Sequence, residues 1–289
     1  MRLLLTGAEG FTGRHLTQAA RAAGYEVVAL RSDLTDAPAV AAEVAAIAPT
    51  HVAHLAAISA VTHADELAFY QVNLFGSLNL LQALAALPVA PQKVLLASSA
   101  NVYGNQGGEP IAETVCPKPI NHYAMSKLAM EHMAANFLDR LPIVITRPFN
   151  YTGVGHDLRF VIPKIVDHFV RKAPVIELGN LDVYREYNDV RQVCEVYLKL
   201  LALGVPGEVY NVCSGKAVSL REVLTQMTQI SSWQPEVQVN PAFVRANDIH
   251  TLTGSPEKLS ATVGRLSAGD LQCLLAWMYE TELASAGQK

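Results

Sequence analysis

Two side chains in the middle of this sequence have the types and the spacing for proton transfer at a carbonyl or alcohol carbon. Tyr123 and Lys127 lie four residues apart, which places both on one face of a helix. A free tyrosine has a pKa of about 10, whereas an acid or base that works at neutral pH needs a pKa of about 7. We expect the Lys127 ammonium to lower the pKa of Tyr123, because one charge at about 4 Å supplies about 4 kcal/mol at an effective dielectric constant of about 20. The alternative is a half-buried surface pair with no chemical role.

A glycine-rich turn near the start of the chain offers a place for the phosphates of a dinucleotide. Gly7, Gly10 and Gly13 follow the apolar run at residues 2–5 and open a helical stretch. Glycine permits the tight turn and the close approach of backbone to phosphate, and the free N–H groups of a helix N-terminus attract the anion. Together with the tyrosine–lysine pair, the turn predicts an enzyme that moves a hydride and a proton. Taken alone, it is also compatible with an ordinary strand-to-helix turn.

The residue at the end of the second predicted strand distinguishes NADPH from NADH. An acidic side chain there binds the ribose hydroxyls, whereas an arginine accepts the 2′-phosphate. Arg31 and then Ser32 occupy this place. Arg31 favours NADPH, with NADH as the alternative if Arg31 is a solvated surface residue. Asp33 follows closely and could contact the adenine.

A buried strand that ends in two serines supplies a third reactive group. The run Lys93–Ser98 is largely apolar and is followed by Ser99. Ligands bind at the carboxyl ends of the strands in such sheets. We therefore expect the Ser99 hydroxyl to hydrogen-bond the substrate oxygen and to orient it toward Tyr123. An ordinary strand-end turn is the alternative.

Short β-like runs alternate with longer helical stretches through the first half of the chain. This order predicts an α/β fold with a doubly wound parallel sheet, the Rossmann arrangement, covered by helices on both faces. Only two residues separate the second strand from the helix start at Asp33, so we expect the usual outer edge strand to be short or missing. The predicted strands are Arg2–Leu5, Glu26–Leu30, Val52–Leu55, Lys93–Ser98, Ile143–Thr146 and Val209–Val212, and the predicted helices are Gly13–Ala23, Ala39–Ile47, Leu67–Leu87, Tyr123–Leu138, Val190–Leu203 and Leu271–Leu283.

The regular alternation weakens after about residue 150, where Pro, Gly and Asn interrupt short segments. We predict a dinucleotide-binding domain over residues 1–149 and 188–212, and a smaller α+β substrate lobe over residues 150–187 and 213–289. In the lobe, Ser219 and Glu222 form a capping-box pattern before a helical run that reaches Ile230.

Composition argues against several other classes of protein. The formal net charge of −4 is unlike that of a nucleic-acid-binding protein. The four cysteines form no C-x-x-C pair, and the nine histidines show no metal-ligand spacing, so we predict no metal site. The lack of a disulfide pattern favours a reducing cytoplasm, and no apolar run approaches the roughly 18 residues of a membrane span.

Several short motifs together give the chain a resemblance to a known family. The glycine turn, Ser-Ser-Ala-Asn-Val-Tyr-Gly at 98–104, the Tyr-x-x-x-Lys pair and Arg-Pro-Phe-Asn at 147–150 resemble the extended short-chain dehydrogenase/reductases that act on nucleotide sugars. More narrowly, the chain resembles the GDP-6-deoxy-4-keto-mannose reductases and their relatives, the GDP-mannose 4,6-dehydratases. The stretches that carry this narrower resemblance are 176–183, 185–186, 210–215, Arg245 and 252–255.

The resemblance covers nearly the whole chain and implies roles for individual residues. Ser99, Tyr123 and Lys127 match the catalytic triad of the family. Two arginines and a lysine among the substrate positions suit a pyrophosphate, and residues 177–180 would line the guanine pocket. The implied coenzyme contacts are Gly7, Gly10, Phe11, Gly13, Arg31, Asp33, Leu34, Leu55, Ala56, Ala57, Ser98, Tyr123, Lys127 and Pro148, and the implied substrate contacts are Ser99, Asn150, Lys164, Glu177, Leu178, Asn180, Arg185 and Arg245.

The reaction implied is the NAD(P)H-dependent reduction of the 4-keto group of a GDP-linked 4-keto-6-deoxy hexose, as in the synthesis of GDP-rhamnose-type sugars. By analogy with similar proteins, the helices at 67–87 and 123–138 imply a homodimer with a four-helix interface. The dehydratases carry an acidic residue just after the catalytic hydroxyl residue, where this chain has Ala100. The 3,5-epimerase-reductases use a cysteine near this strand end, where the sequence places none.

Two alternatives to the reductase remain. A nucleotide-sugar 4-epimerase with tightly bound NAD shares every catalytic residue, so the motifs alone do not separate it from a reductase. A dinucleotide-binding sensor that has kept the fold without turnover is the third hypothesis, and the intact Ser99, Tyr123 and Lys127 argue against it.

Overall fold

A parallel sheet forms the centre of the larger part of the molecule. The computed structural model describes residues 1–59, 65–106, 109–244, 250–264 and 270–287. Six strands pair in the order β10-β5-β4-β3-β1-β2, all parallel. Among the described residues no strand pairs beyond β2, so the prediction of a missing outer strand is confirmed. The strands are β1 (Arg2–Thr6), β2 (Glu26–Ala29), β3 (His51–His54), β4 (Lys93–Ala97), β5 (Ile143–Pro148) and β10 (Val209–Val212).

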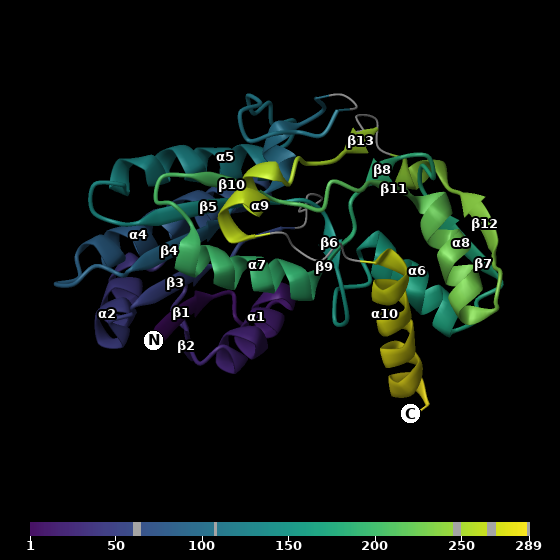
Figure 1. Cartoon of the computed structure of the whole chain (residues 1–289), viewed down its shortest axis with the longest axis horizontal. Coiled ribbons are helices and arrows are strands. Elements are labelled where there is room, and N and C mark those ends of the chain that lie inside the picture. The colour runs from purple at the N-terminus through teal and green to yellow at the C-terminus, as the bar shows by residue number, and fades with distance from the viewer. Residues whose placement is uncertain (60–64, 107–108, 245–249, 265–269, 288–289) are drawn as a thin grey trace.

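Helices cover both faces of this sheet, which confirms the doubly wound Rossmann arrangement (Figure 1). Alternate strand residues point to opposite faces, so Leu3 and Leu5 join one core cluster while Leu4 joins the other. The first cluster is closed by α1 (Phe11–Ala22) and α7 (Val190–Leu203). The second is closed by α2 (Ala37–Ile47), α4 (Ser77–Ala85) and α5 (His122–Ala134).

The helical stretch predicted at 67–87 is interrupted by a wider turn. It begins as α3 (Glu66–Phe69), continues as the π-helix η1 (Tyr70–Gly76) and ends as α4. Gly76 allows this stretch to pack closely, because a Cβ there would lie 2.9 Å from Cβ of Leu34. Single π-turns inside α-helices occur frequently at functional sites, and this one carries the buried Asn73.

A smaller lobe of helices and short strands lies at one end of the sheet, as Figure 1 shows. Ser219 and Glu222 form both hydrogen bonds of the predicted capping box at the start of α8. The lobe core combines aliphatic and aromatic side chains from three helices and one strand pair. Its elements are α6 (Val161–Val170), α8 (Leu220–Ser231), α10 (Leu271–Ala286), the parallel pair β7 (Val175–Leu178) and β12 (Glu236–Val239), and the three-stranded sheet of β8 (Tyr184–Arg185), β11 (Val218–Ser219) and β13 (Thr251–Leu252).

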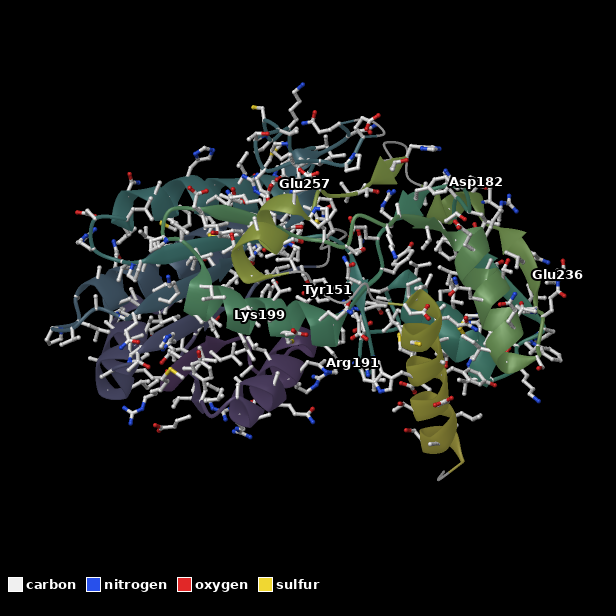
Figure 2. The ribbon with its side chains drawn as sticks, in the orientation of Figure 1. Tyr151, Asp182, Arg191, Lys199, Glu236 and Glu257 are labelled. Carbon is white, nitrogen blue, oxygen red and sulfur yellow. The ribbon has the colours of Figure 1, made fainter. Side chains whose placement is uncertain are left out.

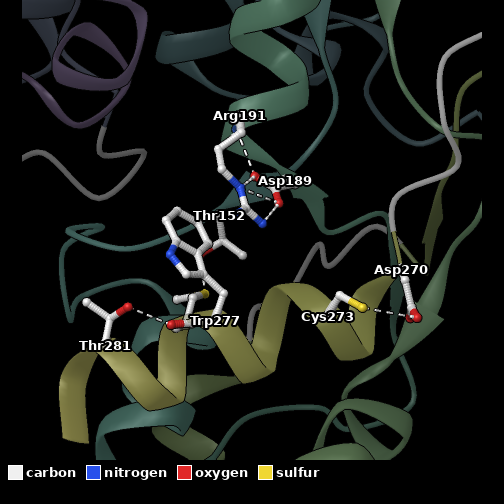
Figure 3. Close-up of polar contacts among 8 residues, drawn as sticks. Thr152, Asp189, Arg191, Asp270, Cys273, Trp277 and Thr281 are labelled. Carbon is white, nitrogen blue, oxygen red and sulfur yellow. Dashed lines mark hydrogen bonds and ion pairs between the residues drawn. The ribbon is translucent and has the colours of Figure 1, made fainter. Parts of the chain in front are cut away.

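Short strands and one cation–aromatic contact join the lobe to the sheet. The strand β6 (Tyr151–Thr152) pairs with β9 (Asn188–Asp189). Asp189 caps α7 and holds the Arg191 side chain, whose guanidinium carbon lies 3.8 Å from the ring centroid of Trp277 in α10 (Figure 3).

One helix from the range predicted for the lobe packs on the sheet instead. Leu259 and Val263 of α9 (Glu257–Val263) belong to the first core cluster, beside α7. No helix among the described residues is long and apolar enough to cross a membrane.

Candidate active site

Ser99 and Tyr123 meet at the carboxyl end of β4. Ser99 is the N-cap of the short 3₁₀ helix η2 (Ala100–Tyr103), where its Oγ accepts a hydrogen bond of 3.2 Å from the N–H of Asn101. Tyr123 lies in the first turn of α5, which is capped by the side chain of Asn121. The Ser99 side chain lies close enough to Tyr123 to act on the pKa of the phenol, and both residues are buried. The structure thus brings together the two hydroxyls that the sequence predicted to act on one substrate oxygen.

Lys127 lies one turn further along α5 and is also buried. Its Nζ donates a hydrogen bond of 2.7 Å to the carbonyl oxygen of Ala97, the last residue of β4. Burial lowers the pKa of Lys127 to about 8, against the opposing effect of the nearby Glu131 carboxylate. Lys127 is therefore mostly charged at neutral pH, although its pKa lies well below the ordinary value for lysine.

The pKa of Tyr123 moves in the direction opposite to the prediction. Burial raises the pKa of Tyr123 above its ordinary value of 10.0, and the hydrogen bond with Ser99 opposes that rise only in part. The expectation that Lys127 lowers this pKa toward neutrality is therefore wrong for the protein alone. The physical reason is that desolvation penalises the phenolate. The phenol is consequently protonated at neutral pH and can act as a proton donor.

The glycine turn has the shape that a dinucleotide phosphate requires. Gly7 has a φ of +69°, and a Cβ on it would lie 2.8 Å from the N atom of Ala56. A Cβ on Gly13 would lie 2.0 Å from the carbonyl oxygen of Gly7, so the helix α1 can pack on the turn only with glycine there. Gly10 is the N-cap of α1 and has no side chain to cap it. The N-terminal N–H groups of α1 are therefore free for an anion, which fits the diphosphate of a nicotinamide dinucleotide.

Aromatic contacts join the glycine turn to the beginning of the lobe. Phe11 stacks on His156 with ring centroids 4.2 Å apart and on Tyr151 at 6.1 Å. The hydroxyls of Thr12 and Tyr151 share a hydrogen bond of 2.8 Å, and Figure 2 shows Tyr151 where the sheet meets the lobe. Tyr151 is also close enough to Tyr123 for the two phenols to influence each other. Through these contacts the glycine turn packs against Tyr151, which lies near Tyr123.

A buried hydrogen-bond chain fixes the backbone beside the glycine turn. The Thr6 Oγ1 accepts from the N–H groups of Leu55 and Ala56 at 3.1 and 3.0 Å, and lies 2.7 Å from Nδ1 of His54. Nε2 of His54 lies 2.8 Å from the Ser77 Oγ, which itself donates to a backbone carbonyl. Because the Ser77 proton is used, Nε2 carries the histidine proton and Nδ1 accepts from Thr6.

His54 is neutral, because burial and, to a lesser extent, the charge of Lys127 lower its pKa to about 3. The residues at 55–57, which the sequence assigned to the coenzyme, follow directly from β3 at this place. Nearby, Oδ1 of Asn73 in the π-helix accepts from the N–H of Ile58, and its Nδ2 donates to the carbonyl oxygen of Ile58. The same Nδ2 donates to the Ser126 Oγ at 3.0 Å. These contacts tie the segment after β3 to the catalytic helix.

The residues after β2 have three different environments. Arg31 is exposed, and its Nη1 lies 3.0 Å from Oε1 of Glu9 in the glycine turn. The Asp33 carboxylate accepts hydrogen bonds from the N–H and the hydroxyl of Thr35, both at 2.8 Å, and these bonds lower its pKa. The Leu34 side chain lies in the second core cluster rather than on the surface. A coenzyme contact by Leu34 would therefore involve its backbone.

Ser98 and Arg147 belong to a buried polar network that includes Glu131 of α5. The Ser98 hydroxyl donates to Oε1 of Glu131, which also accepts from Nε of Arg147 at 3.0 Å. Nη1 of Arg147 donates to the hydroxyl of Tyr103 at 2.9 Å, and Tyr103 donates to Asn211 at 2.8 Å. The Ser98 side chain is thus committed to this network, and β5 ends beside it at Pro148.

Part of the predicted substrate site is assembled on β7 and α6. Nζ of Lys164 donates a hydrogen bond of 2.7 Å to the carbonyl oxygen of Glu177 and lies 4.4 Å from the ring centroid of Phe243. The Glu177 carboxylate accepts from Nδ2 of Asn240 at 3.1 Å. Leu178 is buried in the lobe core. Sequence reasoning missed Phe243 and Asn240, which follow β12.

The other predicted substrate residues lie on separate segments. Asn150 follows β5 and accepts from Asn188 through its carbonyl. Asn180 binds the N–H of Asp182 within its own turn. Arg185 lies on β8, where its Nη1 donates to the carbonyl oxygens of Tyr184 and His250 at 2.8 and 3.2 Å. Arg245 lies outside the described residues. Among the hydrogen bonds of the described residues, Lys164 is joined to Glu177, whereas Asn150, Asn180 and Arg185 bond to other neighbours.

The chain matches a family model over most of its length. The model describes the NAD dependent epimerase/dehydratase family and matches residues 3–213. This chain belongs to that family. The family is NAD(P)-dependent, and the free N-terminus of α1 and the glycine turn fit such a coenzyme.

Two named relatives and one solved structure show which members of the family this chain is similar to. The GDP-6-deoxy-D-talose 4-dehydrogenase of Aggregatibacter actinomycetemcomitans is 35% identical over 289 residues, which cover 98% of both chains. The GDP-6-deoxy-D-mannose reductase of Pseudomonas aeruginosa is 37% identical over 279 residues, which cover 91% of both chains. The structure of RMD from Pseudomonas aeruginosa complexed with NADPH matches with a TM-score of 0.90 at 32% identity, covering 98% of this chain and 99% of that one.

One cysteine of this epimerase/dehydratase-family enzyme lies closer to the catalytic strand than the sequence suggested. Cys213 packs in the same small core cluster as Ala100 and Phe149. Burial raises its pKa well above the ordinary value, with the Glu186 carboxylate adding to the rise. Cys213 therefore stays a thiol and is unsuited to act as an acid or base near neutral pH.

Several residues near the candidate site were not identified from the sequence, because the patterns around them are weak. Glu131 follows Lys127 by four residues, so the same helical spacing that identified the catalytic pair could have identified it. Arg147 is the next-to-last residue of the buried strand β5, which is an unusual place for a charge. Thr6, His54 and Asn73 showed no pattern of their own. Among the described residues, no group of three His, Cys, Asp or Glu lies close enough together to hold a metal ion.

Proposed function

We propose that this enzyme reduces the 4-keto group of a GDP-linked 4-keto-6-deoxy hexose with NADPH or NADH. The observation that carries the proposal is that the buried side chains of Tyr123, Ser99 and Lys127 gather at the end of β4, with burial raising the pKa of the Tyr123 phenol. A reductase needs a proton donor at the carbonyl oxygen, and a phenol with a raised pKa holds its proton until an alkoxide develops. The names of the two curated relatives, both acting on GDP-6-deoxy sugars, support the substrate class.

Each catalytic side chain has a distinct task in this proposal. When bound, the coenzyme would supply the hydride that C4 of the sugar accepts. Ser99 and Tyr123 hydrogen-bond the C4 oxygen, and Tyr123 transfers its proton to that oxygen. Lys127, charged at neutral pH, stabilises the negative charge that then develops on the Tyr123 oxygen. The bond from Lys127 to the carbonyl of Ala97 fixes the position of its ammonium.

Substrate recognition is proposed to rest on cations around the lobe. Lys164 and Arg185 would bind the pyrophosphate, and Arg245 is proposed for the same task from the sequence. Asn150 would contact the sugar, while Glu177, Leu178 and Asn180 would line the guanine pocket. The Phe243 ring is half-exposed beside Lys164 and offers a face for the base.

The direct test supplies GDP-4-keto-6-deoxymannose and follows the absorbance of NADPH and NADH. Consumption of either coenzyme with formation of a GDP-6-deoxy hexose is expected. If neither coenzyme is consumed by folded enzyme, the proposal is wrong. Talose and mannose differ in configuration at C4, so proton NMR of the product assigns the face that receives the hydride.

The alternative is a nucleotide-sugar 4-epimerase, and coenzyme content separates it from a reductase. An epimerase restores its coenzyme in each turnover and retains tightly bound NAD through purification. A reductase exchanges its coenzyme in each turnover. Denaturing the purified protein and measuring released NAD therefore decides between them, with substoichiometric release expected for the reductase.

We also propose that the enzyme is a cytoplasmic homodimer formed through α3, η1 and α5. Leu67, Phe75 and Met125 expose 69%, 54% and 40% of their surface on these elements. Their burial against a second copy would remove apolar area from water. Analytical ultracentrifugation should give twice the mass of 31.2 kDa, and Phe75→Glu should give a monomer.

A further inference from the structure

A carboxylate of the chain itself lies just after β2, the region that binds the adenosine ribose in Rossmann folds. In a Rossmann fold, the adenosine ribose lies beside the carboxyl end of the second strand. Here three hydrogen-bond donors converge just after β2. The N–H of Arg31 donates to Oε1 of Glu43 at 2.8 Å, and the N–H and the hydroxyl of Ser32 donate to Oε2 at 2.7 and 2.6 Å.

This cluster is a small anion-binding site that the chain fills by itself. Backbone N–H groups and a serine hydroxyl are the donors that bind phosphate oxygens in many proteins. Burial acts to raise the pKa of Glu43, but the bonds from Ser32 and Arg31 outweigh it, so the carboxylate is ionised at neutral pH. Glu43 lies on α2, whose Val40 and Val44 are buried, which fixes the helix and with it the carboxylate.

The guanidinium of Arg31, the cation beside this cluster, is also paired with a carboxylate. Nη1 of Arg31 lies 3.0 Å from Oε1 of Glu9. A 2′-phosphate would thus meet two carboxylates, with one guanidinium already paired and three donors already used. The two hydroxyls of an unphosphorylated ribose carry no charge and can donate hydrogen bonds to a carboxylate.

We propose that Glu43 is a specificity-determining residue that makes this enzyme prefer NADH to NADPH. Its carboxylate accepts the hydrogen bonds of the Arg31 N–H and of the Ser32 N–H and hydroxyl, so these groups are not available to a 2′-phosphate. The negative charge of the carboxylate also repels the phosphate. This argues against the NADPH preference that Arg31 alone predicts. The inference rests on the coenzyme part of the proposed function and is independent of the sugar substrate.

The test measures binding rather than turnover. Isothermal titration calorimetry compares NADH with NADPH, and adenosine 5′-monophosphate with adenosine 2′,5′-bisphosphate, which probe the adenosine end alone. Wild-type protein should bind the unphosphorylated member of each pair about tenfold more tightly, the size expected for one additional charge repulsion near the surface. Glu43→Gln keeps the shape and removes the charge, and it should reduce this ratio about tenfold.

Two further variants serve as a control for the lost charge and as an independent test of the same site. Glu26→Gln removes the same charge at the far end of β2, where Glu26 pairs with Arg2, and should leave the ratio unchanged. Glu9→Gln releases Arg31 and should strengthen the binding of the bisphosphate, which remains informative if Glu43→Gln does not fold. The proposal is overturned if the wild type binds NADPH as tightly as NADH, or if folded Glu43→Gln keeps the wild-type ratio. Because these ratios are measured without a sugar substrate, they test the role of Glu43 even if the enzyme does not reduce a GDP-sugar.

Discussion

Arg147 of β5 forms a two-point ion pair with Glu131 of α5. Nε of Arg147 lies 3.0 Å from Oε1 of Glu131, and Nη2 lies 2.6 Å from Oε2. Both side chains are buried, with 7% and 6% of their surface exposed. Glu131 follows Lys127 by one helical turn and raises the pKa of that lysine. The pair therefore connects the end of β5 to the charge of Lys127, the lysine that we propose for catalysis.

The first prediction concerns the pH at which activity falls. The Lys127 pKa is about 8, so we expect kcat to decrease as the pH rises through about 8, because the ammonium is then lost. Replacing Glu131 with Gln removes the carboxylate that favours the charged lysine. The alkaline limb of the kcat profile should therefore move to lower pH.

The matched control for this prediction is Ser98→Ala. It removes a hydrogen bond to Glu131 but leaves the carboxylate charge, so the alkaline limb should stay where it is in the wild type. Glu131→Gln also leaves Arg147 buried beside a neutral partner, which should cost about 3–5 kcal/mol of folding stability. The profile is therefore measured at a temperature at which circular dichroism shows the variant folded. An unshifted limb in folded Glu131→Gln would contradict the assignment to Lys127.

The second prediction separates chemistry from coenzyme binding. Tyr123→Phe removes the proton donor and keeps the ring, so kcat should fall by about 10²–10⁴-fold while the Kd for the coenzyme stays within about twofold. Stopped-flow kinetics and calorimetry measure the two quantities. Tyr279→Phe deletes the same hydroxyl from α10 in the lobe core and should retain full activity. Equal turnover in both variants would exclude Tyr123 as the proton donor.

The third prediction tests the close packing of the glycine turn. A Cβ on Gly13 would lie 2.0 Å from the carbonyl oxygen of Gly7 and 2.7 Å from Cα of Ala8, so Gly13→Ala must displace α1 from the turn. Coenzyme binding should be lost, and the melting temperature should fall. Gly287→Ala is the control, because its Cβ would meet the carbonyl oxygen of Leu283 at an ordinary 3.7 Å. Tight coenzyme binding by Gly13→Ala would show that the turn does not hold the phosphates.

The parts of the fold that follow from local patterns could be predicted from the sequence. Strand and helix periodicity gave the parallel sheet, and the two-residue gap before Asp33 gave the missing edge strand. The interruption of the helical stretch at 70–76 could not be predicted, because it depends on Asn73 bonding to Ile58 and Ser126 across the fold. The helix propensity of a segment does not depend on contacts with distant residues, so it cannot predict this interruption.

The grouping of Ser99, Tyr123 and Lys127 in the fold could be predicted from the sequence, whereas their electrostatics could not. The spacing placed Tyr123 and Lys127 on one helix face, and the motif after β4 placed Ser99 near them. The direction of the Tyr123 pKa required knowledge of burial, which spacing alone does not give. Likewise, Arg31 could be found at the end of β2, but its pairing with Glu9 and the position of Glu43 depend on how α1 and α2 pack on the sheet.

The last prediction concerns Glu186, which is fully buried and joins three segments beside the lobe. Its Oε2 accepts from the N–H of Ser214 at 2.6 Å and from Nδ2 of Asn188 at 3.1 Å, and its Oε1 accepts from the N–H of Gly254 at 2.7 Å. Glu186→Ala leaves these buried donors without their acceptor, so the free energy of unfolding should fall by about 3 kcal/mol or more. Urea denaturation measures the loss, and hydrogen exchange should quicken at Ser214 and Gly254. Glu236→Ala, an exposed carboxylate on β12 (Figure 2), should change neither quantity, and equal stability of both variants would contradict a structural role for Glu186.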